Sequence, residues 1–310
     1  MRVVVIGGSG HIGTYLVPML VESGYHVVNI SRKKREPYQS NPAWKQVEQV
    51  TVDRLEMEKM GAFGDQVAAQ NPEILVDLIC FTPESAAQLV EALQGKVQHF
   101  LHCGTIWVHG HSVSVPTTEN QPRRPFGEYG IQKAAIEAYL LEKARRDGFP
   151  VTILHPGHIV GPGWEPLNPQ GNFNHDVFRK LKQGEELLIP NLGMETVHHV
   201  HAEDVAQAFF KSIVHWNTSI GESFHVVSPA ALTLRGYAEA ISGWYGHEAQ
   251  LRYMPWDQFS QEVSVEDAQA TWDHIAHSPN CSIEKARKLL DYQPRYTSLQ
   301  AVKEALDWKD

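Results

Sequence analysis

The chain has 310 residues, enough for one large domain or two, and its 42% hydrophobic content is ordinary for a globular protein. The formal net charge of −9 argues against a broad nucleic-acid-binding surface. The first strand-like segment starts at residue 2, so the sequence predicts no leader ahead of it. No apolar run reaches membrane-spanning length, and Cys80, Cys103 and Cys281 are not expected to form a disulfide framework. We therefore expect a cytoplasmic protein with no membrane or nucleic-acid partner.

The chain opens with a β-branched segment at residues 2–6 that leads into the glycine-rich sequence Gly-Gly-Ser-Gly-His-Ile-Gly. A helical pattern follows at residues 14–24. Glycines in such a turn allow a sharp bend, close approach to a pyrophosphate and tight packing of the helix on the strand. The helix N-terminus then attracts the anion. The sequence predicts a dinucleotide site formed by Gly7, Ser9, Gly10, His11, Ile12 and Gly13.

Strand and helix signals alternate through the first half of the chain, which is typical of crossover units on a parallel sheet. The predicted strands are residues 25–30, 47–52, 74–80, 99–103 and 151–155, and the predicted helices are residues 82–93 and 128–146. This pattern predicts an α/β fold with a Rossmann-type doubly wound parallel sheet.

After residue 160 the sequence becomes rich in glycine, proline and aromatic residues, as ligand-binding loops often are. Further strands are predicted at 197–200 and 222–227, and helices at 201–211 and 282–290. We expect an NAD(P)-binding domain of residues 1–160 plus about 195–228. A smaller C-terminal substrate-binding domain is expected from residues 161–194 and 229–310.

Tyr129 and Lys133 stand four residues apart in a predicted helix, so their side chains share one face. A neighbouring cation favours the phenolate, so we expect Lys133 to lower the pKa of Tyr129 towards working pH. The tyrosine could then exchange a proton with a substrate hydroxyl or carbonyl. Thr105 follows a central strand, where its hydroxyl can bind the reacting oxygen beside Tyr129.

At this point the chain resembles the extended short-chain dehydrogenase/reductases, the NAD-dependent epimerase/dehydratase family. The resemblance spans nearly the whole chain. The shared features are Gly7, Gly10 and Gly13, Asp53 after the third strand, Thr105 five residues before Gly110, Tyr129 with Lys133, the segment 155–163, and the tail 281–294.

The resemblance implies a role for each matching residue. Tyr129 would be the acid or base, Thr105 would orient the substrate, and Lys133 would also bind the nicotinamide ribose. Asp53 would meet the adenine. Backbone around Pro156 and Gly157 would flank the nicotinamide, and Phe81 and His158 are further expected cofactor contacts. Family members commonly pair through two long helices, so a homodimer is expected.

Departures from the family pattern narrow the activity. Family dehydratases carry an Asp-Glu pair where this chain has Ile106 and Trp107, which argues against elimination of water. Family epimerases often have Arg-Asp before a later histidine, where this chain reads Val-His-His-Val-His at 197–201. A nucleotide-sugar substrate therefore loses support.

The end of the second strand governs cofactor choice, because an acidic residue there accepts the ribose hydroxyls of NAD and a basic one can pair with the 2′-phosphate of NADP. Here Ser31 and Arg32 begin a basic run with no carboxylate before Glu36. This pattern favours NADP(H) over NAD(H), with Ser31 and Arg32 as contacts. The alternative is an ordinary solvated basic loop.

The 17 histidines show no familiar zinc spacing, and we expect no catalytic metal. Substrate contacts are expected from Thr105, Trp107, His158, Trp164 and His199. The predicted function is hydride transfer at a secondary alcohol or ketone of a small polar molecule, including sugars and sugar nucleotides. The alternatives are an NAD-retaining sugar (nucleotide) epimerase and a non-catalytic NAD(P)- or RNA-binding protein.

Overall fold

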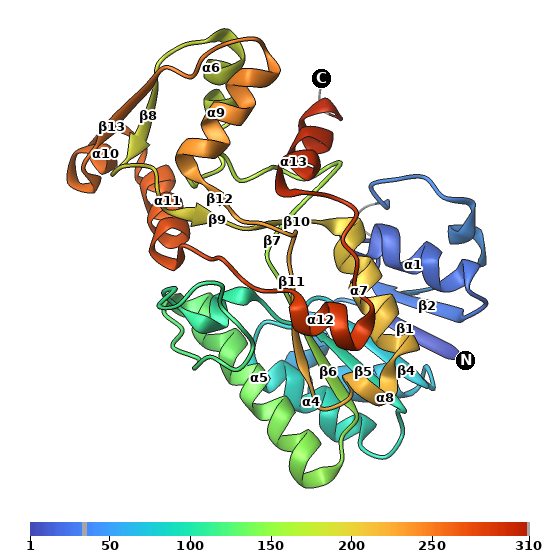
Figure 1. Cartoon of the computed structure of the whole chain (residues 1–310). Helices are drawn as coiled ribbons and strands as arrows, with labels where there is room; N and C mark the ends of the chain where they lie inside the picture. Colours follow the sequence, from blue (N-terminus) through green and yellow to red (C-terminus); the bar gives the residue numbers. More distant parts are fainter. Residues whose placement is uncertain (33–35, 309–310) are drawn as a thin grey trace.

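The computed structural model describes residues 1–32 and 36–308, so the remainder of the predicted basic run, residues 33–35, lies outside the described residues. Within them, a parallel seven-stranded sheet has the strand order β11-β6-β5-β4-β1-β2-β3 (Figure 1). The order reverses between β1 and β4, which is the switch point of a doubly wound fold. The predicted fold class is confirmed. The strands are β1 (Arg2–Ile6), β2 (His26–Ser31), β3 (Glu48–Thr51), β4 (Ile74–Asp77), β5 (His99–Cys103), β6 (Val151–Pro156) and β11 (Ser223–Val226).

Helices cover both faces of this sheet. Alternate residues of β1 face opposite sides, so Val3 and Val5 pack in one hydrophobic core and Val4 and Ile6 in the other. The first core is covered by α1 (Gly13–Glu22), α7 (Ala202–Val214) and α12 (Glu284–Leu290), and the second by α3 (Phe63–Ala68), α4 (Pro83–Leu93) and α5 (Gly127–Asp147) (Figure 1).

The helix boundaries follow from local chemistry. The Thr82 hydroxyl accepts a hydrogen bond from the amide of Ser85 at 3.2 Å and caps α4, whose first residue is Pro83. The long helix α5 ends at Gly148, which adopts the left-handed conformation with φ of 65°. The predicted strand at 74–80 ends early, at Asp77, because the Asp77 carboxylate accepts the amide of Ile79 and turns the chain out of the sheet.

A smaller group of elements lies beside the carboxyl edge of the sheet and has its own hydrophobic core, which includes Leu167, Leu181, Ile189 and Tyr237 (Figure 1). The predicted strand at 197–200 is divided between two of its strands. The elements are β7 (His158–Val160), α6 (Asp176–Gln183), β8 (Leu187–Pro190), β9 (Thr196–Val197), β10 (His199–His201), β12 (Leu232–Thr233), α9 (Leu234–Trp244), β13 (Leu251–Met254), α10 (Trp256–Glu262), α11 (Val265–His277) and α13 (Ser298–Asp307).

The remaining elements are short. They are the 3-10 helices η1 (Pro42–Gln46) and η2 (Ile106–His109) and the helices α2 (Arg54–Lys59) and α8 (Trp216–Ser219). Among the described helices, none is both long and apolar enough to cross a membrane. Cys80, Cys103 and Cys281 are buried free thiols, as expected for small apolar side chains.

Candidate active site

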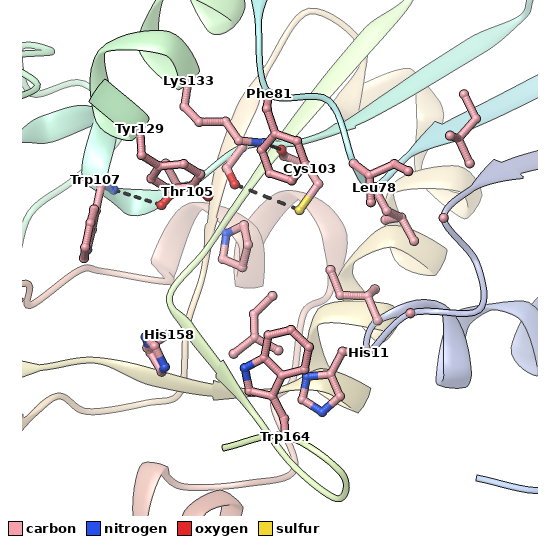
Figure 2. Close-up of a pocket in the computed structure, with 18 of the residues that line it drawn as sticks. His11, Leu78, Phe81, Cys103, Thr105, Trp107, Tyr129, Lys133, His158 and Trp164 are labelled. Carbon is pink, nitrogen blue, oxygen red and sulfur yellow. Dashed lines mark hydrogen bonds between the residues drawn. The ribbon is translucent and has the colours of Figure 1, made fainter. Parts of the chain in front are cut away.

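A cavity of about 890 Å³ opens along the carboxyl ends of β1, β2, β4, β5 and β6, where open α/β sheets bind their ligands (Figure 2). It extends from the glycine turn after β1 to the smaller group of elements. Its lining includes most of the predicted site residues: Gly7, Ser9, Gly10, His11, Ile12, Ser31, Arg32, Asp53, Phe81, Thr105, Trp107, Tyr129, Lys133, Pro156, Gly157, His158 and Trp164.

Two predicted contacts lie outside the cavity lining. A Cβ on Gly13 would come within 2.0 Å of the Gly8 carbonyl oxygen, so Gly13 allows α1 to pack on the turn instead of touching the ligand. His199 is fully buried behind His158, and its Nε2 lies 3.1 Å from the Leu167 carbonyl oxygen. The prediction that His199 contacts substrate is therefore not supported, because its ring is turned into the protein interior.

The glycine turn is supported by a polar residue that the motif did not reveal. Gly7 has a φ of 84°, a conformation that favours glycine. The side-chain oxygen of Asn29 accepts the amide of Gly8 at 3.0 Å, while its nitrogen donates to the Ser9 hydroxyl at 3.0 Å. A buried asparagine inside an otherwise apolar strand was the available signal for this role. Together these contacts shape a turn that fits a pyrophosphate against the start of α1.

Two stacked aromatic rings close the side of the cavity that faces the glycine turn. His11 stacks on Trp164 with ring centroids 4.8 Å apart and an interplanar angle of 16°. Burial lowers the pKa of His11 to about 4, so this ring is neutral at pH 7. Figure 2 shows the two rings side by side below the cavity. The loop that carries Trp164 thereby reaches the glycine turn. It links the part of the cavity beside the glycine turn, the predicted cofactor half, to the part beside the smaller group of elements, the predicted substrate half.

At the far end of the cofactor half, Ser31, Arg32 and Asp53 line the cavity. The Asp53 carboxylate also caps α2, since it accepts the amide of Leu55 at 3.1 Å. Arg54 lines the same region, but its guanidinium is bound to Asp77 at 2.7 Å and to Glu58 at 2.6 Å. Among the described residues at this end of the cavity, Arg32 is a cation without an ion pair to a carboxylate, so its guanidinium can bind a phosphate.

Tyr129 and Thr105 converge as predicted, but the pKa of the phenol shifts in the opposite direction. Tyr129 is 43% exposed, open to the cavity, yet it is enclosed by dense protein on its other sides, and this burial raises its pKa. The nearby Cys103 adds to the increase, and a hydrogen bond from the Thr105 hydroxyl partly opposes it. The prediction that Lys133 lowers the pKa of Tyr129 is therefore wrong, because the Lys133 ammonium is bound to other groups.

The Lys133 side chain lines the cavity and is only 2% exposed. It donates to the carbonyl oxygens of Cys80 and Cys103, each at 2.7 Å, and lies 5.8 Å from the centre of the Tyr129 ring. Burial lowers its pKa, while the surrounding groups partly offset this effect. Lys133 thus joins the end of β5 to the segment that follows β4, close to the Tyr129 ring.

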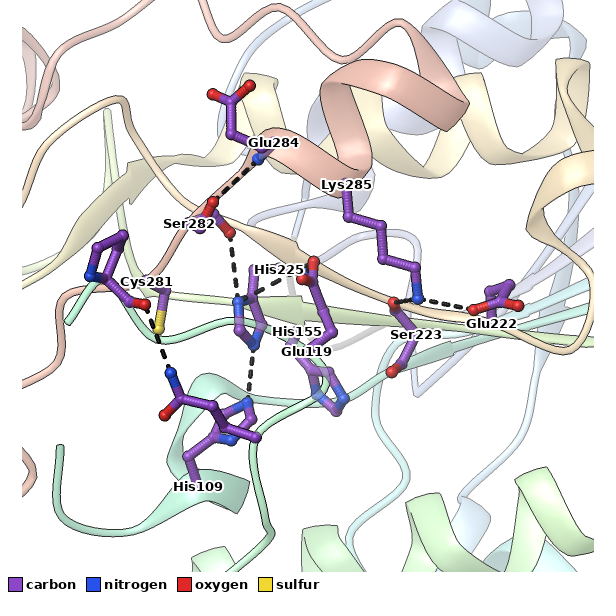
Figure 3. Close-up of polar contacts among 12 residues, drawn as sticks. His109, Glu119, His155, Glu222, Ser223, His225, Cys281, Ser282, Glu284 and Lys285 are labelled. Carbon is purple, nitrogen blue, oxygen red and sulfur yellow. Dashed lines mark hydrogen bonds and ion pairs between the residues drawn. The ribbon is translucent and has the colours of Figure 1, made fainter. Parts of the chain in front are cut away.

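A second polar network lies behind the loop that follows β5 (Figure 3). The Nε2 atoms of His109 and His225 are 2.8 Å apart, and the Glu119 carboxylate accepts the amide of His225 at 2.9 Å. The other ring nitrogen of His225 lies 3.3 Å from the carbonyl oxygen of Ser282. These contacts connect η2, which carries Trp107, to the C-terminal segment.

One buried group among the described residues has metal-ligand geometry. The ligand atoms of Asp77, Cys80 and His102 lie within 4.8 Å of one another. The cations of Arg54 and Lys133 are adjacent, and burial raises the pKa of the Cys80 thiol to about 12, so the thiolate that a metal needs is disfavoured. This chemistry does not favour a cation at the site.

Comparison with known proteins assigns the family. Residues 3–226 match the NAD dependent epimerase/dehydratase family. The chain belongs to this family. The family assignment confirms the resemblance drawn from the glycine turn and from Tyr129 with Lys133, and its members characteristically bind a nicotinamide cofactor.

Two curated relatives in this family are named for different activities, one as a reductase and one as a stem-loop binding protein. The 2′-dehydrokanamycin reductase of Streptomyces kanamyceticus is 34% identical over 281 residues, which cover 89% of this chain and 76% of that protein. The chloroplast stem-loop binding protein of 41 kDa b of Arabidopsis thaliana is 22% identical over 310 residues, 97% of this chain and 77% of that protein.

Solved structures in the family share the fold across the full chain. The UDP-glucose 4-epimerase of Thermotoga maritima, solved with UDP-glucose, superposes with a TM-score of 0.75 at 21% identity, covering 100% of this chain and 98% of that one. The dTDP-glucose 4,6-dehydratase of Bacillus anthracis, solved with NAD, gives a TM-score of 0.73 at 17% identity, covering 99% and 96%.

Proposed function

We propose that this chain is an NADP(H)-dependent reductase that converts a ketone into a secondary alcohol. The observation that carries the proposal is the convergence of Thr105, Tyr129 and Lys133 on the cavity that the glycine turn also lines. Gly7, Gly10 and the start of α1 would hold the pyrophosphate, and Arg32 would pair with the 2′-phosphate. When bound, the nicotinamide supplies a hydride to the carbonyl carbon.

Tyr129 would act as the acid in this direction. Its raised pKa keeps the phenol protonated at neutral pH, which is the form that can donate a proton to the carbonyl oxygen as the carbon is reduced. Thr105, bound to Tyr129 through its hydroxyl, would orient the same oxygen. Lys133 would hold the cofactor ribose. Water then returns a proton to Tyr129, so the reaction consumes one hydride and one proton per ketone.

Reduction is favoured over the alternatives by two features. The basic residue after β2 and the lack of a carboxylate before Glu36 support NADP(H), which is released after each turnover. The relative at 34% identity is named as a reductase. An NAD-retaining epimerase is the second candidate, because structural neighbours are named as UDP-sugar 4-epimerases and one of them was solved with NAD. The cytoplasmic location, the homodimer and the division into two domains stay predictions.

The test combines cofactor analysis with one substitution. Nucleotide released from the purified protein is identified by mass, and NADPH and NADH affinities are measured by fluorescence titration. We expect exchangeable NADP(H) and a Tyr129→Phe variant that binds NADPH normally. The variant should reduce ketones about a hundredfold or more slowly, the usual contribution of a general acid. Tightly retained NAD would favour the epimerase, and full turnover by Tyr129→Phe would remove the proposed acid.

A further inference from the structure

The substrate half of the cavity is walled by aromatic rings in continuous contact. The Trp107 ring meets Tyr129 edge-on at a centroid distance of 6.0 Å and His274 at 5.1 Å. His274 in turn lies 5.4 Å from His158 and 5.7 Å from Phe173. All five side chains line the cavity. The wall therefore runs without interruption from the proposed acid to the smaller group of elements.

Side chains packed behind the aromatic wall hold Trp107 in position. Trp107 stacks on His277 with centroids 4.1 Å apart and an interplanar angle of 12°, and Phe126 stacks on the same histidine at 4.0 Å. The Nδ1 of His277 lies 2.5 Å from the carbonyl oxygen of Asp273, which fixes the ring on α11. The position of Trp107 is thus set before any ligand arrives, and a preorganised wall of this kind favours one ligand shape.

Apolar surface is left open on both sides of this half of the cavity. Phe173 and Trp164 are each 40% exposed although they line a deep pocket, and Leu167, Val197 and Pro279 line it as well. Figure 2 shows Trp164 across the cavity from Trp107 and Tyr129. Exposed aromatic faces in a pocket gain free energy when a ligand with its own apolar face covers them.

The charged side chains are confined to the other half. Among the described lining residues, those that carry a charge at neutral pH are Arg32, Asp53, Arg54 and Lys133, all on the cofactor side. His158 and His274 are neutral, because burial lowers the pKa of each imidazole. A diphosphate placed against the aromatic wall would lose its hydration without gaining a cation, and a polyamine would find no carboxylate.

We propose that the substrate half of the cavity binds an uncharged ketone or secondary alcohol with an apolar ring face, in preference to a nucleotide sugar or a cationic amino sugar. This inference rests on the proposed function. The proposed substrate class differs from the substrates that the names of several relatives specify. The neutral wall that supports it is formed by this chain's Trp107, His158, Phe173 and His274.

The test measures binding to the NADP⁺-loaded protein by calorimetry, so it does not depend on turnover. The probes are phenylcyclohexanone, the matched compound in which a carboxylate replaces the phenyl ring, UDP-glucose and kanamycin. We expect phenylcyclohexanone to bind at least about tenfold more tightly than each charged probe, corresponding to about 1.4 kcal/mol. Equal or tighter binding of any charged probe, or no detectable binding of phenylcyclohexanone, would overturn the proposal.

Two variants separate this pocket from general effects. Phe173→Ala removes an exposed ring of the wall and should weaken phenylcyclohexanone binding about tenfold, the cost of losing one aromatic contact. The control, Trp216→Leu, alters another exposed aromatic residue, on α8 outside the cavity, and should bind normally. Normal NADP⁺ binding with failed ketone binding would refute the substrate class alone, whereas lost NADP⁺ binding would refute the proposed function.

Discussion

The backbone amide of Thr105 donates a hydrogen bond to Nδ1 of His155 at 3.0 Å, and both residues are buried. Since Nδ1 accepts, the ring proton is on Nε2, which lies 2.9 Å from the Glu137 carboxylate. Arg123 holds the other side of that carboxylate at 2.7 and 2.8 Å. Gly104 allows this approach, because a Cβ there would lie 2.3 Å from the His155 ring. The loop that presents Thr105 is thus fixed by the His155 ring.

This contact predicts that His155 holds Thr105 in position in the proposed site. His155→Phe keeps a ring but removes the acceptor for the Thr105 amide, so Thr105 should shift. We expect kcat for ketone reduction to fall about a hundredfold, as for misplacements of about 1 Å, with the Kd for NADPH changed little. The control, His99→Phe, alters another buried histidine, on β5, that lies outside the cavity lining. It should lose stability while keeping kcat, and equal losses of kcat in both variants would contradict the positioning role.

Lys133 should contribute to folding as well as to cofactor binding. Lys133→Met leaves the carbonyl oxygens of Cys80 and Cys103 without their shared donor in a buried place. We expect the free energy of unfolding to fall by about 1–3 kcal/mol, the usual cost of a buried unsatisfied group. Urea denaturation measures this change, and titration should show weaker NADPH binding. A variant as stable as the original protein would show that water replaces the ammonium without cost.

Arg32 should determine the preference for the phosphorylated cofactor. Arg32→Ala removes the cation that lines the cavity after β2, so NADPH binding should weaken about tenfold or more while NADH binding changes little. The ratio of the two Kd values measures this effect. Lys45→Ala, a change in η1 outside the cavity lining, is the matched control. Equal affinity losses for both cofactors would indicate that Arg32 does not meet the 2′-phosphate.

The buried histidines should make the fold sensitive to acid. Burial lowers the pKa values of His198 and His199 to about 4, so the unfolded chain binds more protons than the folded one between about pH 6.5 and 4. Their stabilising contribution is therefore present above about pH 6.5 and is lost as the pH falls through 4, by up to about 3 kcal/mol for each residue.

Denaturant unfolding at a series of pH values measures this dependence. In His199→Asn, the free energy of unfolding should fall less steeply over the acid range than in the original protein. His247→Asn alters an exposed histidine and should leave the slope unchanged. An identical acid slope in His199→Asn and the original protein would contradict the assignment to buried histidines.

Local patterns in the sequence determined the sheet, the glycine turn and the pairing of Tyr129 with Lys133. Each of these depends on neighbours within a few residues: a continuous β-branched run for β1, glycines for the turn, and one helical turn between the phenol and the ammonium. Strand order at the switch point then brings the turn and the pair to one cavity, as the family resemblance implied.

Tertiary packing alone decided the direction in which the pKa of Tyr129 shifts and the burial of His199. It also assembled the aromatic wall from Trp107, Phe173 and His274, which are far apart in the sequence. Desolvation depends on every atom that surrounds a group, and ring contacts between distant segments leave no periodic signal in the chain. The sequence by itself therefore determined that the glycine turn and the tyrosine line one cavity, and the folded structure decided the electrostatics of the tyrosine and the shape of the space beside it.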